Sequence, residues 1–517
     1  MYSWVLSGTV CGVEGCSVGV EVDVSSGLPV FDMVGYLGFA VRESRERVRT
    51  ALKNSGFLLP AKRITVNLSP ADLHKEGSAF DLAIAIAILV AIGAVPQKQV
   101  EGYLVLGELG LNGEVRSVNG VLPMLSHAFS CGISKAIVPC SNVQEGAVVE
   151  GIRVYGVRSL KEAVSFFLAQ EQGIEEITPA QVDVRGLFSL ERNYQRDFSE
   201  IAGQDFVKRA LEIAAAGFHN ILLVGPPGAG KSMMAQCLPS ILPGLTLAES
   251  IELTKIYSVR GLLGEGESLI TRRPFRAPHH TVSCTAVTGG GRSPLPGEMS
   301  LAHKGILFLD ELPEFKREVI EAMRQPLEEG RVTVSRLQAA YTFPSDFMLV
   351  AAMNPCLCGY YPDRMRCRCS EGQIQRYLSK VSQPLLDRID LCVQTRPVSY
   401  EQLHSRKSAE SSQQIRGRVT RAQLLQRERY QNSGIVFNSQ LSAKQLEQFC
   451  FLDEEGEAFM KQAMGRFDFS ARTYHRILRV ARTIADLAES DTIRQSHLCE
   501  AIAYHNGNLK NMFPDSE

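Results

Sequence analysis

The sequence LLVGPPGAGKSMMAQCLP, residues 222–239, places a glycine-rich loop between an apolar run and a helical pattern. Residues 225–232 fit the pattern G-x-x-x-x-G-K-[S/T], and the helical pattern, residues 232–238, follows directly. Glycines let successive backbone N–H groups turn toward a phosphate chain, and the N-terminus of the next helix adds its positive dipole end. A chance glycine-rich loop is the alternative, but the strand and helix on either side favour a nucleotide site.

The residues of this loop have expected roles toward the nucleotide. Lys231 is expected to reach the β- and γ-phosphates, and the Ser232 hydroxyl is expected to ligate Mg²⁺. ATP and Mg²⁺ are therefore the expected cofactors. The nucleotide-binding set predicted from the loop is Gly225, Pro226, Pro227, Gly228, Ala229, Gly230, Lys231, Ser232 and Met233.

Two carboxylates and an amide follow two further apolar runs. GILFLDE, residues 305–311, ends in Asp310 and Glu311, and MLVAAMN, residues 348–354, ends in Asn354. Ligands bind at the carboxyl ends of strands in parallel sheets, so these side chains are expected beside the loop. Asp310 would hold Mg²⁺ through water and join the nucleotide-binding set. Glu311 would polarise the attacking water, and Asn354 would orient that water or sense the γ-phosphate.

Length, charge and cysteine content limit the class of protein. The 517 residues suggest about three domains, and the formal net charge of −1 excludes an overall positive field that attracts nucleic acid. The first residues lack the pattern of a signal peptide, and the longest apolar run, residues 82–95, predicts a buried helix rather than a membrane span. Thirteen cysteines without a secretion signal favour the reducing cytoplasm.

The pattern of apolar segments divides the chain into four parts. Residues 1–168 alternate β-rich and helical runs and predict a compact α/β domain, and the polar residues 169–195 predict a linker. Residues 196–398 predict a parallel sheet covered by helices, and residues 399–517 predict a helical lid. The expected fold class is α/β. The expected strands of the parallel sheet include residues 221–224, 306–309 and 348–352.

Four of the thirteen cysteines lie close together in CLCGYYPDRMRCRC, residues 356–369. The spacing C-x-C-x8-C-x-C allows four thiolates to close a tetrahedral Zn²⁺ site, because the turn residues between the pairs would fold one pair onto the other. Reduced, unliganded thiols on a loop are the alternative. The expected structural zinc ligands are Cys356, Cys358, Cys367 and Cys369, within an insertion at residues 354–370.

The order of these motifs resembles that of AAA+ ATPases. PLLDRID, residues 384–390, follows them, and IAGQDFVKRALEIAAAG, residues 201–217, resembles the segment before the phosphate loop. GGGRSPLPGEMSLAHKGILFLDE resembles the magnesium-chelatase branch of that superfamily. Three segments resemble the ComM/YifB family of competence-associated helicases: RPFRAPHHTVS at residues 273–283, NPCLCGYY at residues 354–361 and SARTYHRILRVARTIADL at residues 470–487.

The resemblance implies roles for two arginines. Arg388 would be the arginine finger that reaches the ATP of a neighbouring subunit, and Arg472 would be the second sensor on the helical lid. A guanidinium is a permanent, planar partner for γ-phosphate oxygens, and a finger given in trans couples hydrolysis to a ring. An ion pair of Arg388 with Asp387 or Asp390 is the alternative. The arginines that continue from Arg472 at helical spacing are interpreted mostly as a solvated face or subunit interface: Arg476, Arg479 and Arg482.

Three N-terminal segments carry a second resemblance: KEGSAFDLAIAIAIL at residues 75–89, GELGLNGEVRSVNGV at residues 107–121 and GISKAIVPCSN at residues 132–142. They resemble the Lon-type protease domain, an S5-like α/β fold in which a lysine activates a serine. On that family's K-D-G-P-S-A-G pattern, Ala79 falls on the nucleophile and Ser78 is one position off, while the lysine position falls in GVLPML. We therefore expect a degenerate, non-proteolytic domain used for assembly or DNA contact.

Two basic segments are candidates for gripping a polymer. EGRVTVSRLQAAYTFP, residues 329–344, predicts a β-hairpin at the place where related motors push a hairpin into a central pore. LLGEGESLITRRPFRAPHH, residues 262–280, resembles the insertion in the second helix of the same motors. A positive loop in a pore follows a phosphate backbone without reading sequence, although a solvated loop is the alternative for each. The expected DNA contacts are Arg336 near the hairpin tip and Arg272, Arg273 and Arg276 in the second segment.

These observations favour an ATP-dependent DNA motor. Similarity to the ComM family implies a hexamer that translocates on DNA and unwinds or branch-migrates it, so that incoming single-stranded DNA recombines into a chromosome during natural transformation. Single-stranded and branched DNA, further copies of the chain and recombination proteins are the expected partners, and no membrane is expected. One alternative is a magnesium-chelatase-like or protein-remodelling ATPase that does not act on DNA. An ATP-dependent protease is disfavoured by the missing serine–lysine pair.

Overall fold

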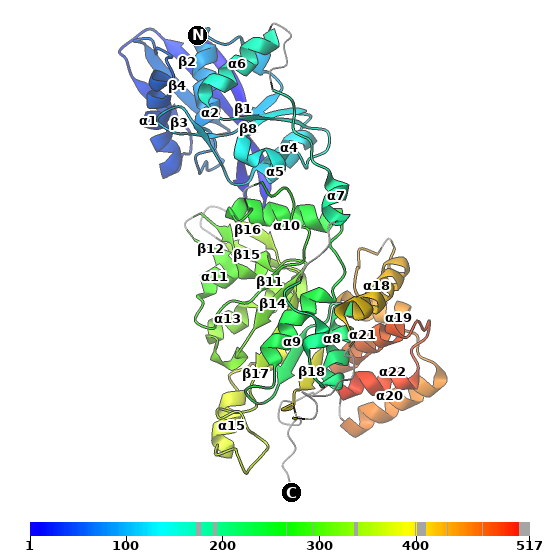
Figure 1. Ribbon diagram of the computed structural model, residues 1–517. Helices are drawn as coiled ribbons and strands as arrows, with labels where there is room; N and C mark the ends of the chain where they lie inside the picture. The colour runs from blue at the N-terminus through cyan, green and yellow to red at the C-terminus, as the bar shows by residue number, and fades with distance from the viewer. Residues whose placement is uncertain are drawn as a thin grey trace.

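The computed structural model contains two parts built around sheets and a third part built from helices (Figure 1). Figure 1 shows the N-terminal part above the second sheet and the C-terminal helices beside that sheet. None of the helices described is long and apolar enough to cross a membrane. The structure describes residues 1–171, 177–189, 194–264, 266–291, 293–335, 340–398, 400, 410–431, 433–467 and 469–505.

The N-terminal sheet is mixed, with the strand order β3-β4-β2-β1-β5-β8-β9. β1 and β2 form a long antiparallel hairpin, and β5, β8 and β9 continue from β1 in parallel. Its strands are β1 Tyr2–Cys11, β2 Glu14–Ser25, β3 Phe31–Val34, β4 Arg63–Ser69, β5 Tyr103–Val105, β8 Lys135–Pro139 and β9 Arg153–Val157, with a ribbon of β6 Glu108–Leu109 and β7 Val115–Arg116.

A buried helix fills the space beside this sheet. The longest apolar run forms α2, Asp81–Ala91, and every residue of α2 is buried, packed against β1, β2 and α1. This confirms the prediction of a buried helix, which a run of apolar residues without a polar face requires. The other helices of this part are α1 Phe39–Asn54, α3 Gln97–Val100, α4 Val121–Ser130, α5 Val143–Gly146 and α6 Leu160–Glu171, and α7 Val184–Ser189 follows them.

The second sheet is wholly parallel, with the strand order β11-β14-β17-β10-β18. Runs of small and branched apolar residues, buried on both faces, form its central strands, as expected for a sheet covered by helices. The fold class predicted from the sequence is thereby confirmed. The strands are β10 Ile221–Val224, β11 Phe275–Arg276, β14 Ile306–Leu309, β17 Met348–Met353 and β18 Leu391–Gln394.

Helices and two short ribbons surround this sheet. The first ribbon pairs β12 Gly289–Gly290 with β13 Leu295–Pro296, and the second pairs β15 Arg331–Ser335 with β16 Ala340–Pro344. The helices are α8 Asp205–Gly217, α9 Lys231–Cys237, α10 Leu247–Arg260, α11 Cys284–Thr288, α12 Glu298–Leu301, α13 Arg317–Ala322, α14 Arg324–Glu329, α15 Glu371–Leu378 and α16 Gln383–Leu386.

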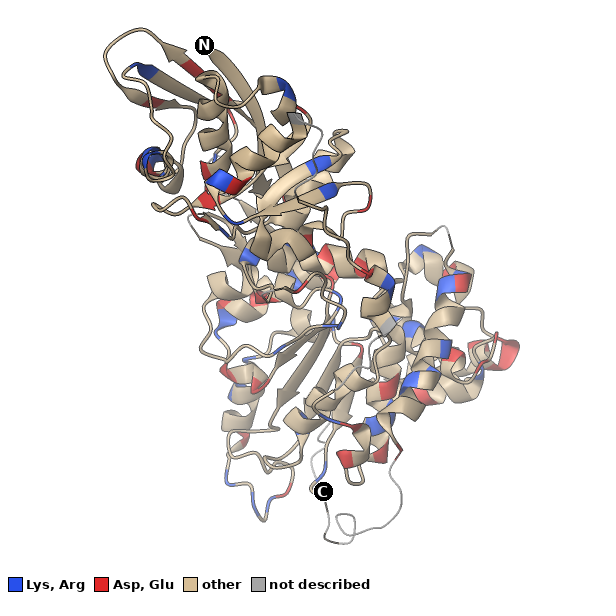
Figure 2. Cartoon of the chain, turned by 45° about the horizontal axis from the view of Figure 1, so that its top comes forward, with Lys and Arg blue, Asp and Glu red and all other residues tan. Residues whose placement is uncertain are grey.

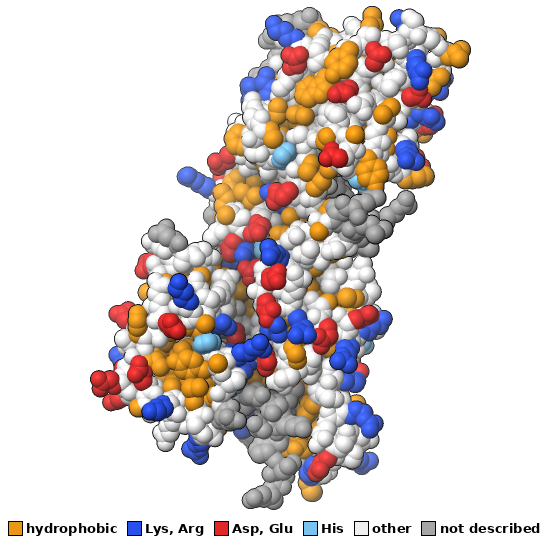
Figure 3. Space-filling view, turned by 180° about the vertical axis from the view of Figure 1, so that it is seen from behind, with side chains coloured by type: hydrophobic (Ala, Val, Ile, Leu, Met, Phe, Trp, Pro, Cys, Tyr) orange, Lys and Arg blue, Asp and Glu red, His pale blue; other side chains and the backbone are white. Residues whose placement is uncertain are grey.

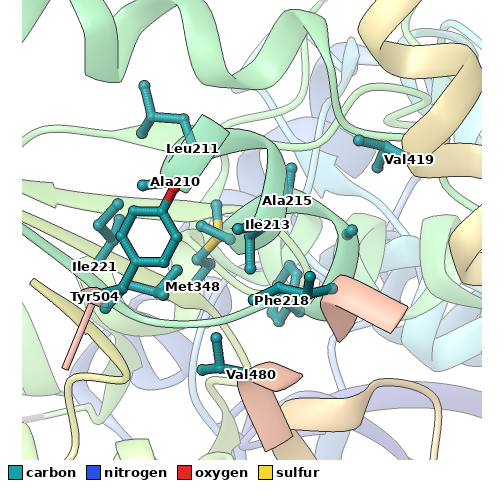
Figure 4. Packing of buried hydrophobic residues seen from close by; sticks show 14 of the residues in the cluster. Ala210, Leu211, Ile213, Ala215, Phe218, Ile221, Met348, Val419, Val480 and Tyr504 are labelled. Atoms are coloured by element: carbon teal, nitrogen blue, oxygen red, sulfur yellow. The ribbon is translucent and has the colours of Figure 1, made fainter. Parts of the chain in front are cut away.

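One hydrophobic cluster joins the sheet to the C-terminal helices. Helix α8 lies between them and contacts both α18 and α21. Figure 4 shows the apolar side chains of α8 together with Ile221 and Met348 of the sheet and with Val419 and Val480 of the C-terminal helices. These helices are α18 Ser412–Arg429, α19 Ala443–Phe449, α20 Glu454–Phe467, α21 Ala471–Leu487 and α22 Gln495–Ala503.

The N-terminal part contacts the second sheet region through α10. The backbone N–H of Gly120 donates to the carbonyl of Ser258 in α10 (3.2 Å). The buried Glu145 carboxylate accepts from the Leu122 N–H (2.8 Å) and the Asn142 amide (3.1 Å), and also from the Ser258 hydroxyl. A buried carboxylate with donors from both parts therefore lies in this contact.

Charges of both signs alternate along all three parts, as Figure 2 shows, in agreement with the small net charge. The view from behind in Figure 3 shows apolar side chains gathered over the C-terminal helical region at lower left. Phe451 and Phe467 are among the exposed large apolar residues of that region. An exposed apolar patch of this kind marks a surface that contacts another molecule.

Candidate nucleotide and metal sites

The glycine-rich loop joins the carboxyl end of β10 to α9. α9 begins at Lys231, directly after Gly230. Gly230 has a φ of +81° and Gly228 a φ of +77°, both left-handed. Glycine takes this conformation without the cost that a Cβ atom imposes. At Gly225 a Cβ atom would lie 2.1 Å from the hydroxyl oxygen of Thr395, so the chain passes β18 too closely for any side chain.

Lys231 is buried within the loop that precedes it. Its ammonium donates to the carbonyls of Gly225 (2.7 Å) and Pro226 (2.9 Å) and to the amide oxygen of Asn354 (3.1 Å). Burial lowers the pKa of Lys231, and the nearby Asp310 carboxylate opposes that shift. The lysine thus meets the amide that the sequence placed at the end of β17.

The two residues predicted to hold Mg²⁺ lie in direct contact. The Ser232 hydroxyl donates to Asp310 Oδ2 (2.6 Å), and the Glu311 backbone N–H donates to Asp310 Oδ1 (2.9 Å). Hydroxyl and carboxylate oxygens are the ligands that Mg²⁺ prefers, often with several waters retained. The donor set at the ends of α9 and β14 therefore fits a hydrated Mg²⁺ beside a phosphate.

Glu311 has an unusual backbone. Its φ of +52° lies in the left-handed region, where a residue with a side chain is strained by about 1–3 kcal/mol. The side chain is largely exposed. Strain of this kind persists where the surrounding structure fixes it. An exposed side chain suits a group that must reach a water molecule.

Asn354 is held by a second contact that the sequence did not indicate. Burial raises the pKa of the Tyr377 phenol in α15 to about 12, and the nearby backbone N–H of Asn354 opposes that shift. The side-chain oxygen of Asn354 accepts from Lys231, as described above. Asn354 therefore lies between α15 and the phosphate loop.

Arg388 does not lie at the loop of its own chain. Its guanidinium pairs with Glu328 in α14 and donates to the carbonyl of Pro384, and the side chain is largely buried. The alternative drawn from the sequence was an ion pair of Arg388 with Asp387 or Asp390. The partners differ, because Asp390 pairs with His219 (2.9 Å) and Asp387 pairs with Arg472. A buried Nε without a partner remains on Arg388. Arg388 is thus held by contacts with α14 and α16.

Arg472 lies in the first turn of helix α21 and has a largely exposed side chain, 3.8 Å from Asp387. Within the described residues, neither Arg472 nor Arg388 hydrogen-bonds to the phosphate loop.

The other arginines of α21 were expected to lie mostly on a solvated face or a subunit interface, and the structure corrects this expectation. Arg476 donates to the carbonyls of Leu386 (3.0 Å) and Ile389 (2.8 Å) and is buried. Arg479 donates to Leu441 O (2.8 Å), and Arg482 is buried against Asp486 (3.1 Å), because α21 packs inside the helical region.

The four clustered cysteines meet as their spacing predicted. Their sulfur atoms all lie within 4.8 Å of one another. Three of the separations are 3.4, 3.7 and 3.6 Å, and a tetrahedral site with Zn–S bonds of about 2.3 Å separates its sulfurs by about 3.8 Å. The thiol geometry therefore fits a Zn²⁺ ion. The four residues are Cys356, Cys358, Cys367 and Cys369.

Backbone donors surround these sulfurs. The Tyr361 N–H donates to Cys356 Sγ (3.4 Å). Burial raises the pKa of the Cys358 thiol, but the N–H groups of Tyr360 and Arg368 and the neighbouring thiols outweigh it and bring that pKa to about 6. Burial instead raises the pKa of Cys369 and brings that of Cys367 to about 12, so among these three thiols only Cys358 is biased toward the thiolate, the form that binds a metal.

Among the arginines expected to contact DNA, Arg273 differs most from the expectation. The Arg273 side chain is buried and donates to the carbonyls of Pro243 (2.8 Å) and Lys304 (2.6 Å), with Glu249 3.3 Å away, so it is a structural residue here and not a surface contact. Arg276 forms a two-bond pair with Glu298. Arg272 is exposed. The predicted hairpin forms as β15 and β16, and Arg336, which was expected near its tip, lies outside the described residues.

The N-terminal part shows no serine–lysine pair at the expected positions. The Ser78 hydroxyl donates to Glu108, and the position expected for the lysine is occupied by the buried Leu122. Lys75 is buried and its ammonium donates to the Pro70 carbonyl. This arrangement offers no lysine to activate Ser78.

Sequence reasoning missed His280 as a neighbour of Glu311 and Gly359 as a neighbour of the phosphate loop. The histidine follows β11 and the glutamate follows β14, which are adjacent strands. Only the register in which β11 pairs with β14 shows that His280 and Glu311 lie close together. The contact of Gly359 depends on the path of the cysteine loop, for which the sequence carries no signal beyond the turn residues.

Three family profiles and several known relatives match most of the length of this chain. Family profiles match residues 197–403 as magnesium chelatase subunit ChlI, residues 20–142 as subunit ChlI of Mg-chelatase, and residues 409–505 as the ChlI C-terminal region. The Competence protein ComM of Haemophilus influenzae is 42% identical over 97% of this chain and 96% of its own length. YifB of Escherichia coli is 42% identical over 95% of both chains. The magnesium-chelatase 67 kDa subunit of Chlorobaculum parvum is 26% identical over 39% of this chain and 27% of its own.

Membership of the magnesium-chelatase-like AAA+ group implies ATP hydrolysis with Mg²⁺, which the site geometry accommodates. The family also suggests an oligomer. Identity above 40% along nearly the whole length decides between the branches of this group. The chain belongs to the ComM/YifB family of magnesium-chelatase-like AAA+ ATPases.

Proposed function

We propose that this protein is an ATP-driven DNA motor that acts as a ring in the cytoplasm and promotes integration of incoming single-stranded DNA by homologous recombination during natural transformation. The observation that carries the proposal is the 42% identity, over nearly the full length, to a protein named for competence. The nucleotide site supports it, because loop, carboxylates and amide lie within contact of one another. Single-stranded and branched DNA are the proposed substrates.

The hydrolytic step follows from the contacts within the site. Ser232 and Asp310 would hold Mg²⁺, and the ion would supply positive charge beside the phosphates. Lys231 exchanges its carbonyl partners for phosphate oxygens, and Asn354 stays beside it. Glu311, whose carboxylate is largely exposed, polarises the attacking water. Lys231 and Ser232 begin α9, and the other three groups follow strand ends, so the sheet and this helix together set their geometry.

In a ring, Arg388 and Arg472 would both take part in ATP hydrolysis. Arg388 exchanges its pairing with Glu328 for the γ-phosphate of a neighbouring subunit, and Arg472 acts as the second sensor. A permanent cation delivered in trans makes hydrolysis depend on assembly. The exposed apolar side chains over the C-terminal helices in Figure 3 supply a surface suited to such packing.

DNA would be gripped by the hairpin of β15 and β16 and by the segment around Arg272. These elements present an exposed cation and a hairpin, and a positive pore loop follows a phosphate backbone irrespective of sequence. Burial removes Arg273 from this set, and the pairing of Arg276 with Glu298 makes it a weaker candidate.

The proposal is tested by steady-state ATP hydrolysis with and without single-stranded and forked DNA. Stimulation by DNA that disappears in Lys231→Ala supports a DNA motor, and strand displacement or branch migration by the wild type completes the test. Vigorous hydrolysis that DNA leaves unchanged contradicts it.

A chelatase-like or protein-remodelling role is the second candidate, favoured by the match of three separate segments to magnesium chelatase subunit profiles. It predicts hydrolysis that is indifferent to DNA and responds instead to a protein partner. The same assay therefore separates the two candidates.

A further inference from the structure

The cysteine loop leaves β17 beside the nucleotide site and returns to it. Asn354, the amide in contact with Lys231, is separated from the first cysteine by one proline. After the last cysteine, Ser370 caps α15, and this helix carries Tyr377 back to the backbone of Asn354. The segment that carries the four sulfurs therefore begins at Asn354, and α15 returns the chain to the neighbourhood of the Asn354 backbone.

A second contact connects the cysteine loop to the phosphate loop directly. Gly359, between the two cysteine pairs, has a φ of +84°, and a Cβ atom there would lie 2.5 Å from the Pro227 ring. That separation is shorter than any real Cβ contact, so only a bare backbone fits. The turn at Gly359 thus forms an outer wall of the phosphate loop.

Tyr361 packs against the hydrophobic cluster of the sheet edge, and the other contacts printed for the described segment between the cysteines are mostly local, such as Arg364 over the Tyr361 ring. The segment forms no helix or strand, and its backbone hydrogen bonds are local turns such as Gly359 N–H to Cys356 O (3.0 Å) and Cys367 N–H to Asp363 O (2.7 Å). Cys356 and Cys367 are buried in the hydrophobic cluster of the sheet edge, which also contains Val224. The sulfur tetrahedron is the element that can fix this turn against the phosphate loop.

We propose that a thiophilic divalent cation, Zn²⁺ by its geometry, binds the four cysteines and is thermodynamically linked to nucleotide binding, because it fixes Gly359 against Pro227 and Asn354 against Lys231. If metal favours the nucleotide-binding arrangement, nucleotide favours metal retention by the same factor. This inference rests on nucleotide binding at the loop and not on any action on DNA.

The test measures metal release from the purified full-length protein to a chromogenic chelator, with and without a non-hydrolysable ATP analogue and no DNA present. The metal content is measured first by elemental analysis. The analogue is expected to slow release by about fivefold or more, the lower range of allosteric coupling. Lys231→Ala should keep its metal and lose this protection.

Two variants separate the linkage from simple loss of folding. Gly359→Ala should keep the metal, since all cysteines remain, but should weaken analogue binding severalfold and reduce the protection. Gly372→Ala is the matched control, because a Cβ there meets nothing within 4 Å. Cys369→Ser should lose metal and analogue affinity together, whereas Cys499→Ser, at an exposed cysteine of α22, should change neither.

The proposal is overturned by absence of any bound metal in the purified protein, or by a release rate that the analogue leaves unchanged while its binding is verified by fluorescence. Equal analogue affinity in Gly359→Ala and Gly372→Ala would overturn the proposed contact. A DNA-independent ATPase with nucleotide-protected metal would leave the linkage standing while contradicting the proposed DNA motor.

Discussion

The imidazole of His280 lies 3.6 Å from the carboxylate of Glu311. Their strands are parallel neighbours in which Phe275 pairs with Ile306, and each of the two side chains lies five positions beyond its strand's paired residue. Equal offsets along paired parallel strands bring the two residues to the same level at the sheet edge. His280 is therefore a positioning partner of the residue proposed to polarise water.

Replacement of His280 by alanine is expected to lower kcat about tenfold while the KM for ATP changes little. The carboxylate of Glu311 would lose the partner that restricts it, whereas the phosphate loop would keep its contacts; a tenfold loss corresponds to about 1.4 kcal/mol of transition-state stabilisation. Steady-state kinetics over a range of ATP concentrations measure both parameters.

The adjacent histidine supplies the control. His279 is exposed and contacts Thr281 and the His280 ring (4.0 Å between centroids) rather than the carboxylate, so His279→Ala should lower kcat far less than His280→Ala. Equal losses in the two variants would mean that the segment, and not the contact with Glu311, matters.

The phosphate loop and the strands around it follow from the sequence because their signals are local. β10 and β14 begin and end at the predicted residues, and β17 extends one residue further than predicted. Apolar runs with turn residues at their ends specify such buried strands almost completely. Four cysteines at close spacing likewise needed no distant partner to be placed together.

Contacts made through tertiary packing were beyond sequence reasoning. Arg273 and Arg482 look like surface cations in the sequence, yet each is buried where backbone carbonyls and a carboxylate satisfy its guanidinium. The neighbour of Arg388 is Glu328, which is sixty residues away in the chain. An arginine pattern alone cannot distinguish a solvated helix face from one that packs inside a helical region, because both have the same spacing.

The buried carboxyl of Glu145 predicts a pH dependence of stability. Burial raises the pKa of Glu145 above its ordinary value of 4.5, although donors from Ser258, Leu122 and Asn142 oppose the shift. Its native form therefore binds protons more readily than its unfolded form. Stability from this group is fully present below pH 4.5 and is lost as the pH rises through the raised pKa.

Glu145→Gln removes this titration. Relative to the variant, the wild type is expected to lose stability as the pH rises above 4.5 and to level off once the native carboxyl is ionised. Thermal denaturation of both proteins between pH 4 and pH 8 measures the difference in Tm. The exposed Glu150→Gln is the control, and a Tm difference between wild type and Glu145→Gln that is constant with pH contradicts the assignment.

The proposed action of Arg388 on a neighbouring subunit predicts that two inactive variants restore ATP hydrolysis when they are mixed. Lys231→Ala cannot engage phosphate and Arg388→Ala lacks the proposed finger, so each alone should lose most of its ATP hydrolysis, the latter by about 10³-fold. In a mixture, some subunits would pair an intact loop with an intact arginine from a neighbour. Recovery of part of the wild-type rate on mixing checks this, with light scattering to confirm assembly.

A mixture that stays inactive while both variants assemble would place Arg388 in cis or in a structural role. The pairing with Glu328 supplies a further check, because Glu328→Gln should leave the Arg388 side chain free to leave its buried position without removing its charge. Glu328→Gln should therefore retain ATP hydrolysis if Arg388 acts on the nucleotide of a neighbouring subunit.

Two adjacent arginines are expected to behave in opposite ways. Arg273→Ala removes a buried guanidinium and leaves Glu249 and two carbonyls without their partner, which should destabilise the protein by about 3–5 kcal/mol and lower Tm. Arg272→Ala changes an exposed side chain and should leave Tm nearly unchanged. It should instead weaken DNA binding by an amount that shrinks as salt rises, because a phosphate contact releases counterions.

Thermal denaturation and a salt titration of DNA affinity, performed on both variants, separate the two roles. If Arg272→Ala binds DNA with the wild-type salt slope, this segment does not contact the phosphate backbone, and the hairpin of β15 and β16 remains as the proposed grip. If Arg273→Ala keeps the wild-type Tm, the buried contacts of its guanidinium contribute no net stability. The pair is informative because neighbouring residues of the same type share composition and local sequence, so only their burial differs.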